Sequence, residues 1–236
     1  MIEGIVLVDK PVGWTSFDVV NFIRKLIANY QGVKPKTIKI GHAGTLDPFA
    51  SGLLIILIGK NYTRKMTSLL KLDKVYQVGL VLGQNSTTGD IEGELTEISN
   101  DKPSLDEIKT VIKSFIGTIN QKPPIYSAIK INGIRAYDYA RKGREVDIPI
   151  RQVRINYIEN IVYDYPKVEF ICEVSSGTYI RSLVEDIGNK IKTGAFTSSL
   201  SRISVGNFNL SSAIKISSKS EVALILDNII KIDLNN

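Results

Sequence analysis

The first sixty residues combine two apolar runs of strand length with one segment of helical periodicity. Residues 3–9 and Leu53 to Ile58 are the apolar runs, and each predicts a strand. Between them, apolar residues recur three or four positions apart, as on one face of a helix: Val19, Phe22, Ile23, Leu26 and Ile27. We expect Ser16 to cap this helix, which runs to about Tyr30. A further short strand is predicted over Thr37 to Ile40.

The middle of the chain shows both periodicities again. Lys74 to Leu82 alternates between two sets of side chains, which is typical of a strand, and residues 83–89 form a polar loop. Ser104 and Glu107 have the spacing of a capping box, which predicts a helix running to about Phe115.

The remaining residues predict two strands, a helix and a final mixed segment. Residues 153–163 and 167–175 have the pattern of paired strands, and Thr178 is the expected cap of a helix. A Ser-rich stretch over 197–220 contains a short strand, and a last helix covers 220–230. Because helices and strands do not alternate regularly, we predict an α+β fold, with helices flanking a mixed, mostly antiparallel central sheet.

Length and composition suit one domain over residues 1–236. The chain is 43% hydrophobic, which is enough to build a substantial core. Its longest apolar run, Leu53 to Ile58, is far shorter than the roughly 20 residues of a membrane helix. The N-terminal residues show neither a basic region nor a cleavage site, so we expect no signal peptide and a cytoplasmic location. We also expect a monomer without membrane contact.

Cysteine and histidine are too few for the common metal and redox sites. The single cysteine, Cys172, shares a strand face with Val168, Phe170 and Val174, so we predict a buried core thiol. The single histidine, His42, excludes a multi-histidine metal site, and one cysteine excludes a Cys-rich zinc site. The glycine motifs of phosphate loops and dinucleotide folds are absent, which disfavours a kinase, a GTPase or a dehydrogenase.

Positive charge is concentrated in one segment. The formal net charge is +6, and residues 121–154 hold eight Lys or Arg residues against three acidic ones. Tyr126, Tyr137 and Tyr139 are interleaved among them. Cations that neutralise phosphates, next to aromatic rings that stack on bases, favour a nucleic-acid surface. An ordinary solvated basic face is the alternative.

Residues 41–52, which we call the aspartate loop, are the most promising place for chemistry. Asp47 precedes Pro48, and the proline keeps the aspartate out of helical geometry. The segment is either a plain turn, since Asp-Pro commonly starts one, or a loop that presents a catalytic carboxylate.

Arg181 gives an independent indication. With Thr178 as the cap, Arg181 lies in the first turn of its helix, where the dipole opposes a cation by about 0.3–1 kcal/mol. A buried carboxylate partner would offset that cost. The alternative partner is Glu185, one turn later, and the sequence does not choose between them.

Five segments, in order along residues 9–202, resemble the TruB-type tRNA pseudouridine synthases, and the aspartate loop is the most specific of them. The segments are Asp9-Lys10-Pro11-x-Gly13-x-Thr15-Ser16; Gly41-His42-x-Gly44-Thr45-Leu46-Asp47-Pro48-x-Ala50-x-Gly52-x-Leu54; Lys74-x-Tyr76 with Gly83-x-x-x-x-Thr88-x-Asp90; Pro123-Pro124-x-Tyr126-Ser127-Ala128-x-Lys130-x-x-Gly133 with Tyr137 and Ala140-Arg141; and Ser176-Gly177-Thr178-Tyr179-Ile180-Arg181-Ser182-Leu183.

The resemblance implies the pseudouridine synthase fold and the isomerisation of a uridine at position 55, in the T-loop of tRNA, after the base is flipped. Asp47 would be the catalytic carboxylate, Arg181 would pair with it, and Tyr76 would lie against the uracil. Residues 121–152 or so would form the family's RNA-gripping insertion. The residues expected to contact RNA are His42, which stacks in the T-loop, Leu200, which lines the pocket, and Arg64, Lys130, Arg141, Lys142, Arg144 and Tyr179. The resemblance also implies no metal and no cofactor.

Two departures from the family pattern matter. The familiar Leu-Arg-Arg reads Leu200-Ser201-Arg202, which puts contacts at Ser201 in doubt. Bacterial members usually carry a C-terminal RNA-binding domain of the PUA type, which we do not expect here. The alternatives are a non-catalytic tRNA-binding or tRNA-folding protein on the same scaffold and a guide-RNA-dependent uridine isomerase. Whether Asp47 attacks the ribose or the base stays open.

Overall fold

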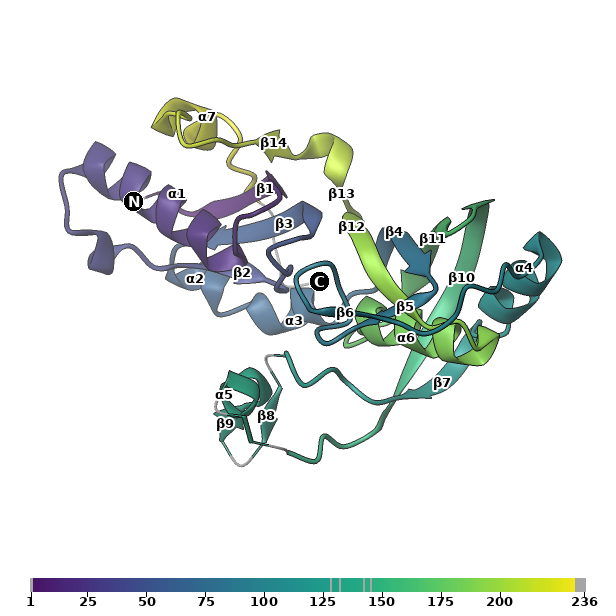
Figure 1. Ribbon diagram of the computed structural model, residues 1–236. Coiled ribbons are helices and arrows are strands. Elements are labelled where there is room, and N and C mark those ends of the chain that lie inside the picture. The colour runs from purple at the N-terminus through teal and green to yellow at the C-terminus, as the bar shows by residue number, and fades with distance from the viewer. Residues whose placement is uncertain (1, 128, 132, 142, 145, 232–236) are drawn as a thin grey trace. The chain divides into compact units, whose positions relative to one another are not determined.

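The chain divides into two compact units (Figure 1). The computed structural model describes residues 2–231 except 128, 132, 142 and 145, and for Arg135 and Arg141 the backbone only. The first unit runs to Tyr76 and resumes at Ser201, and the second is residues 77–200. Strands β4 (Lys74–Leu82) and β12 (Ala195–Val205) each begin in one unit and end in the other.

A mixed sheet forms the framework of the first unit. β1 (Gly4–Lys10) and β3 (Ser51–Ile58) are antiparallel neighbours along their whole length. Shorter strands complete the sheet. β14 (Ile214–Lys215) is parallel to β1, and β2 (Ile40–Ala43) is antiparallel to β3. The end of β12 is parallel to β3, and β13 (Phe208–Asn209) is antiparallel to β12. The sheet is therefore mixed and mostly antiparallel in this unit.

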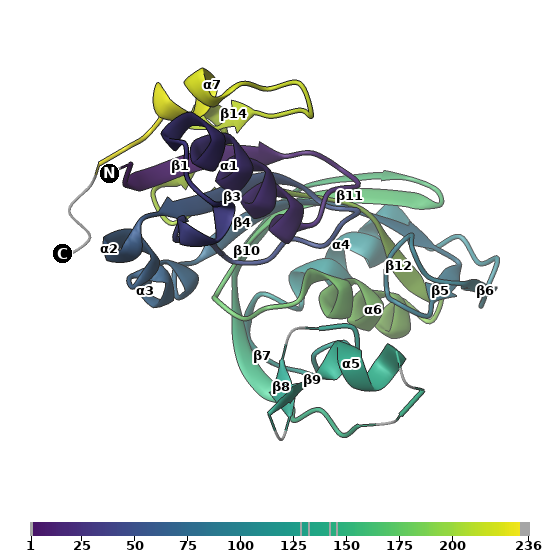
Figure 2. The ribbon, with the colours of Figure 1, turned by 90° about the vertical axis from the view of Figure 1, so that its left-hand side faces the viewer.

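Both faces of this sheet are covered, which explains the unbroken apolar run of β3. Leu54, Ile56 and Ile58 belong to one core cluster, with apolar residues of α1 (Ser16–Gln31). Leu53, Ile55 and Leu57 alternate with them and belong to a second cluster, with residues from the segment of α2 (Lys60–Thr63) and α3 (Met66–Leu70). All six side chains are fully buried. Figure 2 shows α1 lying along this sheet, with α7 (Val222–Leu226) beside it.

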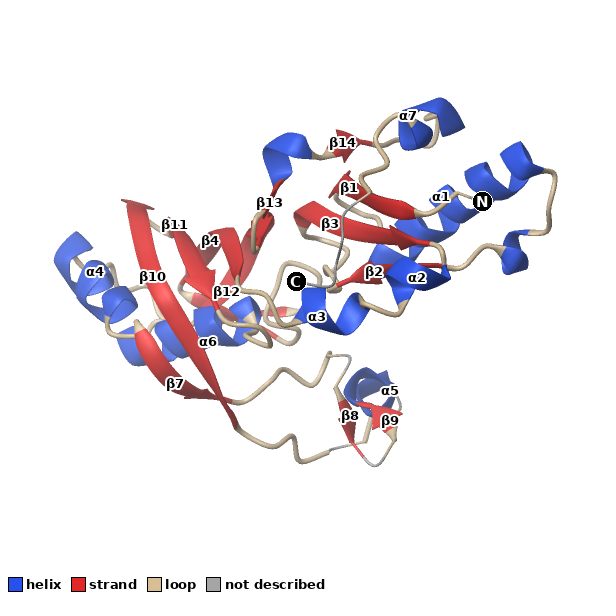
Figure 3. Cartoon of the chain, turned by 180° about the vertical axis from the view of Figure 1, so that it is seen from behind, coloured by secondary structure: helices blue, strands red, loops and turns tan. Residues whose placement is uncertain are grey.

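The second unit is built on a long antiparallel pair. β10 (Arg151–Asp164) pairs with β11 (Lys167–Val174) on one side and with β7 (Gly117–Gln121) on the other. Helices α4 (Leu105–Lys113) and α6 (Ile180–Ile191) contact each other, and β5 (Gln84–Ser86) pairs with β6 (Leu95–Glu97). Figure 3 shows these strands and helices from behind.

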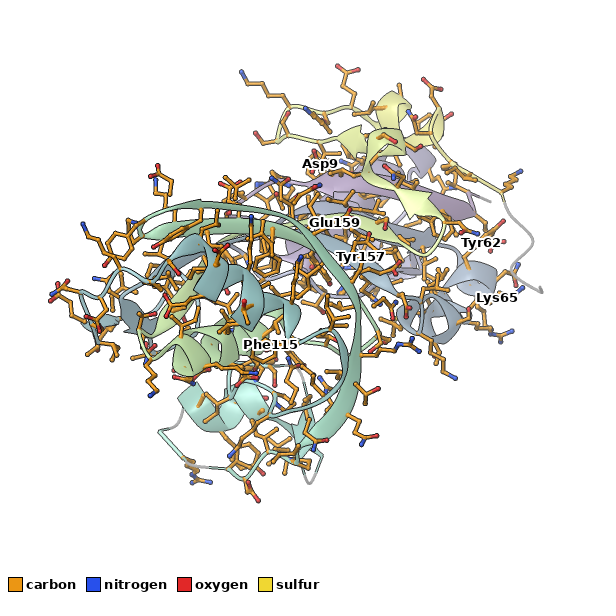
Figure 4. The ribbon with its side chains drawn as sticks, turned by 90° about the vertical axis from the view of Figure 1, so that its right-hand side faces the viewer. Asp9, Tyr62, Lys65, Phe115, Tyr157 and Glu159 are labelled. Carbon is orange, nitrogen blue, oxygen red and sulfur yellow. The ribbon has the colours of Figure 1, made fainter. Side chains whose placement is uncertain are left out.

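Figure 4 labels Phe115, just beyond α4, and this ring takes part in the joint between α4 and α6. The ammonium of Lys190 lies 5.2 Å from the Phe115 ring centre and donates to the Ser114 hydroxyl at 2.7 Å. The contact ties the last turn of α6 to the end of α4.

The segment around 121–152 forms a small structure of its own in the second unit. β8 (Lys130–Ile131) and β9 (Ile134–Arg135) make a hairpin, and α5 (Ala136–Arg141) follows directly. Gly133 has a φ of 82°, a conformation that favours glycine in the tight connection.

Several predictions from the sequence are confirmed. The α+β class, the strand Lys74–Leu82, the capping box at Ser104 and Glu107, and the pairing of β10 with β11 are all present. Cys172 is fully buried, and burial raises the pKa of its thiol to about 12. Among the described residues, no helix is both long and apolar enough to cross a membrane.

Both predicted N-caps beside functional residues are wrong. Thr15, not Ser16, caps α1. The Asp18 amide donates to the Thr15 hydroxyl, and the Thr15 amide donates to the Asp18 carboxylate, which completes a capping box. Tyr179, not Thr178, precedes α6, since the Thr178 hydroxyl donates to the Ser175 carbonyl instead.

Other element boundaries also differ from prediction. Residues 35–37 form a 3₁₀ helix that starts at a proline, and the strand follows at Ile40 instead of ending there. The loop 83–89 contains β5, because residues 95–97 supply a strand partner. β12 is longer than a short strand, since pairing on both of its sides outweighs the weak strand preference of serine. The last helix is short because Ile230 pairs with Ile5.

Candidate functional site

Asp47 lies in the connection between β2 and β3. The backbone amide of Ala50 donates to the Asp47 carbonyl at 3.1 Å, which closes a turn with Pro48 at its second position. Leu46 and Phe49, on either side, are 3% and 5% exposed, whereas the Asp47 side chain is only half-buried. Buried neighbours therefore anchor the loop on both sides of Asp47.

Ser16 holds the residue before Asp47 from both backbone groups. Its hydroxyl accepts from the Leu46 amide at 2.8 Å and donates to the Leu46 carbonyl at 3.1 Å. Ser16 is 2% exposed, so these bonds are shielded from water. The start of α1 thus fixes the backbone next to the carboxylate.

Two buried cations hold the loop on either side of Leu46. The Nη2 atom of Arg202 donates to the Gly44 carbonyl at 3.0 Å, and its Nε atom donates to the Leu53 carbonyl at 2.7 Å. The Lys10 ammonium is 3.4 Å from the Pro48 carbonyl and 2.6 Å from the Trp14 carbonyl. The carbonyls of alternate residues 44, 46 and 48 are therefore all bound by buried side chains.

Two glycines of the aspartate loop make room for Arg202. Gly44 and Gly52 have φ values of 95° and 99°, which L-residues rarely adopt. A Cβ atom at Gly52 would lie 2.5 Å from the Arg202 carbonyl oxygen, and one at Gly44 would lie 3.3 Å from Arg202 Nη1. A larger residue at Gly52 would clash with the backbone of β12 at Arg202, and one at Gly44 would require the guanidinium to shift slightly.

His42 precedes the loop's turn on β2 and is half-buried. Burial, followed by the positive charge of Arg202, lowers the pKa of its imidazole. The lowered pKa favours the neutral ring, the form that loses least on leaving water. A neutral ring suits the stacking role that the resemblance implies.

Tyr76 and Lys74 are inward-facing neighbours on β4. Tyr76 is 7% exposed, so it is a buried ring as well as a site candidate. The Lys74 ammonium donates to the carbonyls of Leu70 and Leu72, at 3.0 and 2.5 Å. Burial, with the charge of Arg202, lowers the pKa of Lys74 to about 8.

Arg181 is held in the second unit by two carbonyls and a carboxylate. Its Nη1 and Nη2 atoms donate to the carbonyls of Thr88 and Tyr126, both at 2.8 Å. Nη1 also lies 3.4 Å from the Asp90 carboxylate, and both side chains are about 95% buried or more. The expectation of a buried carboxylate near Arg181 is thus met by Asp90, whereas Glu185 is exposed.

Asp90 is itself held in place. Its carboxylate accepts from the Thr88 hydroxyl at 2.6 Å and from the Glu92 amide at 3.0 Å. It therefore provides Arg181 with a fixed negative charge, which offsets the opposing helix dipole.

Tyr179 is positioned by a buried glutamine. Its amide donates to the Gln121 side-chain oxygen at 2.8 Å, and the Gln121 side-chain nitrogen donates back to the Tyr179 carbonyl at 3.0 Å. The Arg151 guanidinium lies 4.8 Å from the Tyr179 ring centre. The residue before α6 is therefore fixed at both its backbone and its ring.

A cavity of about 400 Å³ lies beside Arg181 within the second unit. Glu185 and Asp186 of α6 line it together with Thr88 and Tyr126. Burial, with the charge of Glu185, raises the pKa of Asp186 to about 6. Burial of its carboxyl also raises the pKa of Glu185, although the residue as a whole is exposed. The cavity therefore combines a fixed guanidinium with two carboxyl groups of raised pKa.

The remaining candidates are spread over both units. Leu200 is 8% exposed on β12, whereas Arg64, Lys130 and Arg144 are exposed. Arg141 ends α5, and Lys142 lies outside the described residues. Lys122 of the basic segment pairs with Asp147 at 3.8 Å, but both side chains are largely exposed, so the pair contributes little.

His42 and Asp47 lie in the first unit, and Arg181 and Tyr179 lie in the second. Asp47 and Arg181 belong to different units, so their expected pairing stays a prediction. Sequence reasoning expected Ser16 only as a helix cap, and it gave no role to Lys10, Arg202 or Gln121. The available signal for Lys10 and Ser16 was their place inside the first matched segment, and Arg202 ends the Leu200-Ser201-Arg202 stretch, whereas Gln121 lies outside the matched segments. Within the described residues, no three His, Cys, Asp or Glu side chains gather in a way that could hold a metal.

Comparison with known sequences gives close matches over most of the chain. Residues 31–180 match the model described as TruB family pseudouridylate synthase (N terminal domain). The tRNA pseudouridine synthase B of Clostridium acetobutylicum is 43% identical over 231 residues, which are 98% of this chain and 76% of that protein. The protein of the same name from Chlamydia trachomatis serovar L2 is 40% identical over 213 residues, covering 90% and 85%.

Solved structures show the same fold. A chain of a Cbf5-Nop10-Gar1 complex aligns with a TM-score of 0.66 and 30% identity, over 90% of this chain and 52% of that one. A chain of an H/ACA RNP bound to a substrate RNA containing 2'-deoxyuridine aligns with a TM-score of 0.63 and 28% identity, over 90% and 50%. This chain thus spans about half the length of those two.

Proposed function

The chain belongs to the TruB family of pseudouridylate synthases, and from that premise we propose that it converts uridine 55, in the T-loop of tRNA, to pseudouridine. The likeness to the solved structures confirms the expected pseudouridine synthase fold. The tRNA substrate is carried over from relatives named tRNA pseudouridine synthase B.

Asp47 is the proposed catalytic carboxylate. The isomerisation breaks the bond between ribose C1′ and N1, turns the uracil, and forms a bond from C1′ to C5, after which C5 loses its proton to N1 or solvent. An ionised carboxylate can add to a carbon or stabilise positive charge at the sugar. The observation that carries the proposal is the half-buried Asp47 at a turn whose neighbouring carbonyls are bound by buried side chains. Such bracing reduces the motion of the carboxylate before reaction.

Arg181 is proposed to pair with Asp47 and keep it ionised when the site closes around the base. The rigid guanidinium supports this role, because its carbonyl and Asp90 contacts preset its direction. Tyr76 would lie against the uracil and Leu200 would line the pocket. Base flipping is helped by apolar and aromatic surroundings of this kind.

RNA recognition is proposed to involve His42, Arg64 and Tyr179 together with the insertion. The insertion's exposed Lys130 and Arg144 can neutralise phosphates of the T-arm. We further propose that the chain acts as a cytoplasmic monomer, with neither metal nor cofactor.

One assay tests the function against its alternatives. A tRNA transcript tritiated at uridine C5 is incubated with purified protein alone in EDTA, and tritium release is measured. Release with wild-type protein supports an independent, metal-free synthase. A tRNA-binding or tRNA-folding protein would bind without release, and a guide-dependent enzyme would release tritium only after a guide RNA is added.

A further inference from the structure

A basic pocket lies within the first unit, whereas the insertion belongs to the second. It has a volume of about 450 Å³ and is lined by Arg24, Lys25, Lys36 and Lys39, together with Asn21 and Ile38. Asn21, Arg24 and Lys25 come from α1, and Lys36 and Lys39 lie in the connection from α1 to β2. The residues that line the pocket in the described part of the chain all belong to the first unit.

The charge around this pocket is uncompensated. Five Lys or Arg residues lie between Asp18 and Asp47, and no acidic residue lies among them. Within the described part of the chain, none of the four cations lining the pocket has a carboxylate within ion-pair distance. Four like charges around one hollow repel one another, so an anion bound there would relieve the repulsion.

Arg24 is held in place at the pocket. Its guanidinium donates to the side-chain oxygen of Asn21 and lies 3.5 Å from the Ile40 carbonyl. It also lies 6.0 Å from the ring centre of Phe17. A guanidinium fixed by such contacts loses little entropy when it binds a phosphate.

An exposed aromatic ring accompanies these charges. Phe17, Asn21 and Arg24 are spaced four and three residues apart, so they share one face of α1. The Phe17 ring is 59% exposed, although apolar residues of the opposite face are buried. Phosphate-binding cations beside an accessible aromatic face are the combination that favours nucleic acid over a plain solvated face.

The basic pocket is also close to the aspartate loop along the backbone. Ile40, which lines the pocket, is two residues from His42 on β2. Two strand residues span about 7 Å. RNA that occupies the pocket would therefore be within a few ångströms of the strand that leads into the loop.

We propose that this basic pocket binds the phosphate backbone of the substrate RNA, with Phe17 against a neighbouring base or ribose. The identity of the RNA as substrate rests on the proposed function. The pocket would be a second electrostatic contact, separate from the insertion.

Binding measurements on a tRNA transcript at several salt concentrations test this proposal. The variant K36Q/K39Q removes two exposed lysines of the pocket. The slope of log affinity against log salt should fall by about 0.7–0.9 per lost contact, or about 1.4–1.8 in total. The control K215Q/K219Q removes the same charge from exposed positions elsewhere in the first unit and should keep the wild-type slope.

A second variant separates the aromatic contact from the charges. F17A should weaken RNA binding about fivefold or more, at an unchanged salt slope. The proposal is wrong if K36Q/K39Q keeps the wild-type slope, or if the control lowers it equally. Tritium release by wild-type protein reports separately on the proposed function, so that function can stand when the pocket proposal fails. RNA binding can likewise be tested when no tritium is released.

Discussion

The hydroxyl of Ser16 bonds to both backbone groups of Leu46, at 2.8 and 3.1 Å. This relationship joins the start of α1 to the residue before Asp47. Its neighbour Thr15 is the exposed cap of the same helix. The two adjacent hydroxyls therefore have different roles: that of Ser16 holds the aspartate loop, and that of Thr15 caps the helix.

Ser16→Ala should lower kcat/KM by more than its loss of folding stability would explain. The buried Leu46 amide would lose its partner, which costs about 1–3 kcal/mol of unfolding free energy. Displacement of the loop should lower kcat/KM about 10- to 100-fold. Thr15→Ala is the control: it should cost about 1 kcal/mol of stability with kcat unchanged. Tritium release gives kcat/KM for each variant, and urea unfolding gives its stability. Equal kcat/KM values for the two variants would contradict a positioning role for Ser16.

Asp47→Asn should abolish turnover while tRNA binding stays within about tenfold of wild type. The amide preserves the shape of the side chain but can neither add to carbon nor stabilise positive charge. Asp227→Asn, at an exposed position of the same unit, should behave as wild type. Multiple turnover by the Asp47→Asn protein would remove Asp47 from its proposed role.

Arg181→Lys should lose about a hundredfold or more in kcat, because one ammonium cannot bind the Thr88 and Tyr126 carbonyls and a carboxylate with the same geometry. Single-turnover rates at saturating protein give this number without a contribution from binding. Asp90→Asn, which keeps the size of the arginine's neighbour, should lose less. Near-normal rates with lysine would show that charge alone suffices at this position.

Lys74 should make the unfolding free energy rise with pH in the alkaline range. Its pKa is about 8 in the folded chain against an ordinary 10.5, so between these values the unfolded chain binds more protons. The contribution of Lys74 to the unfolding free energy therefore rises as the pH increases from about 8 to about 10.5. Wild-type protein should gain stability relative to Lys74→Met across this window, as measured by urea unfolding. Lys71→Met, at an exposed position, should run parallel to wild type.

Neutralising Arg141, Lys142 and Arg144 together should lower the salt slope of tRNA affinity by about 0.7–0.9 for each phosphate contact that is lost. The matched control replaces the exposed Lys102, Lys113 and Lys192 of the same unit with glutamine. An unchanged slope in the test protein would mean that these residues form only a solvated face.

Local pattern predicted the elements whose residues interact with near neighbours in the chain. The capping box at Ser104 and the alternation of Lys74–Leu82 depend on residues a few positions apart, and both are confirmed. The cap at Ser16 was wrong because the adjacent Thr15 hydroxyl takes that role, while the Ser16 hydroxyl bonds to Leu46 outside the helix. The cap at Thr178 was wrong because its hydroxyl donates to the Ser175 carbonyl and the helix begins after Tyr179.

The sequence by itself determined the α+β class, the buried thiol of Cys172 and the motifs around Asp47 and Arg181, because apolar periodicity and residue type are properties of short segments. Only the tertiary structure decided that Arg202 and Ser16 hold the aspartate loop, and that Asp90 lies beside Arg181. These contacts join residues 30 to 158 positions apart, which no local pattern encodes. They form because buried carbonyls and charges must find partners wherever the packed strands and helices bring them.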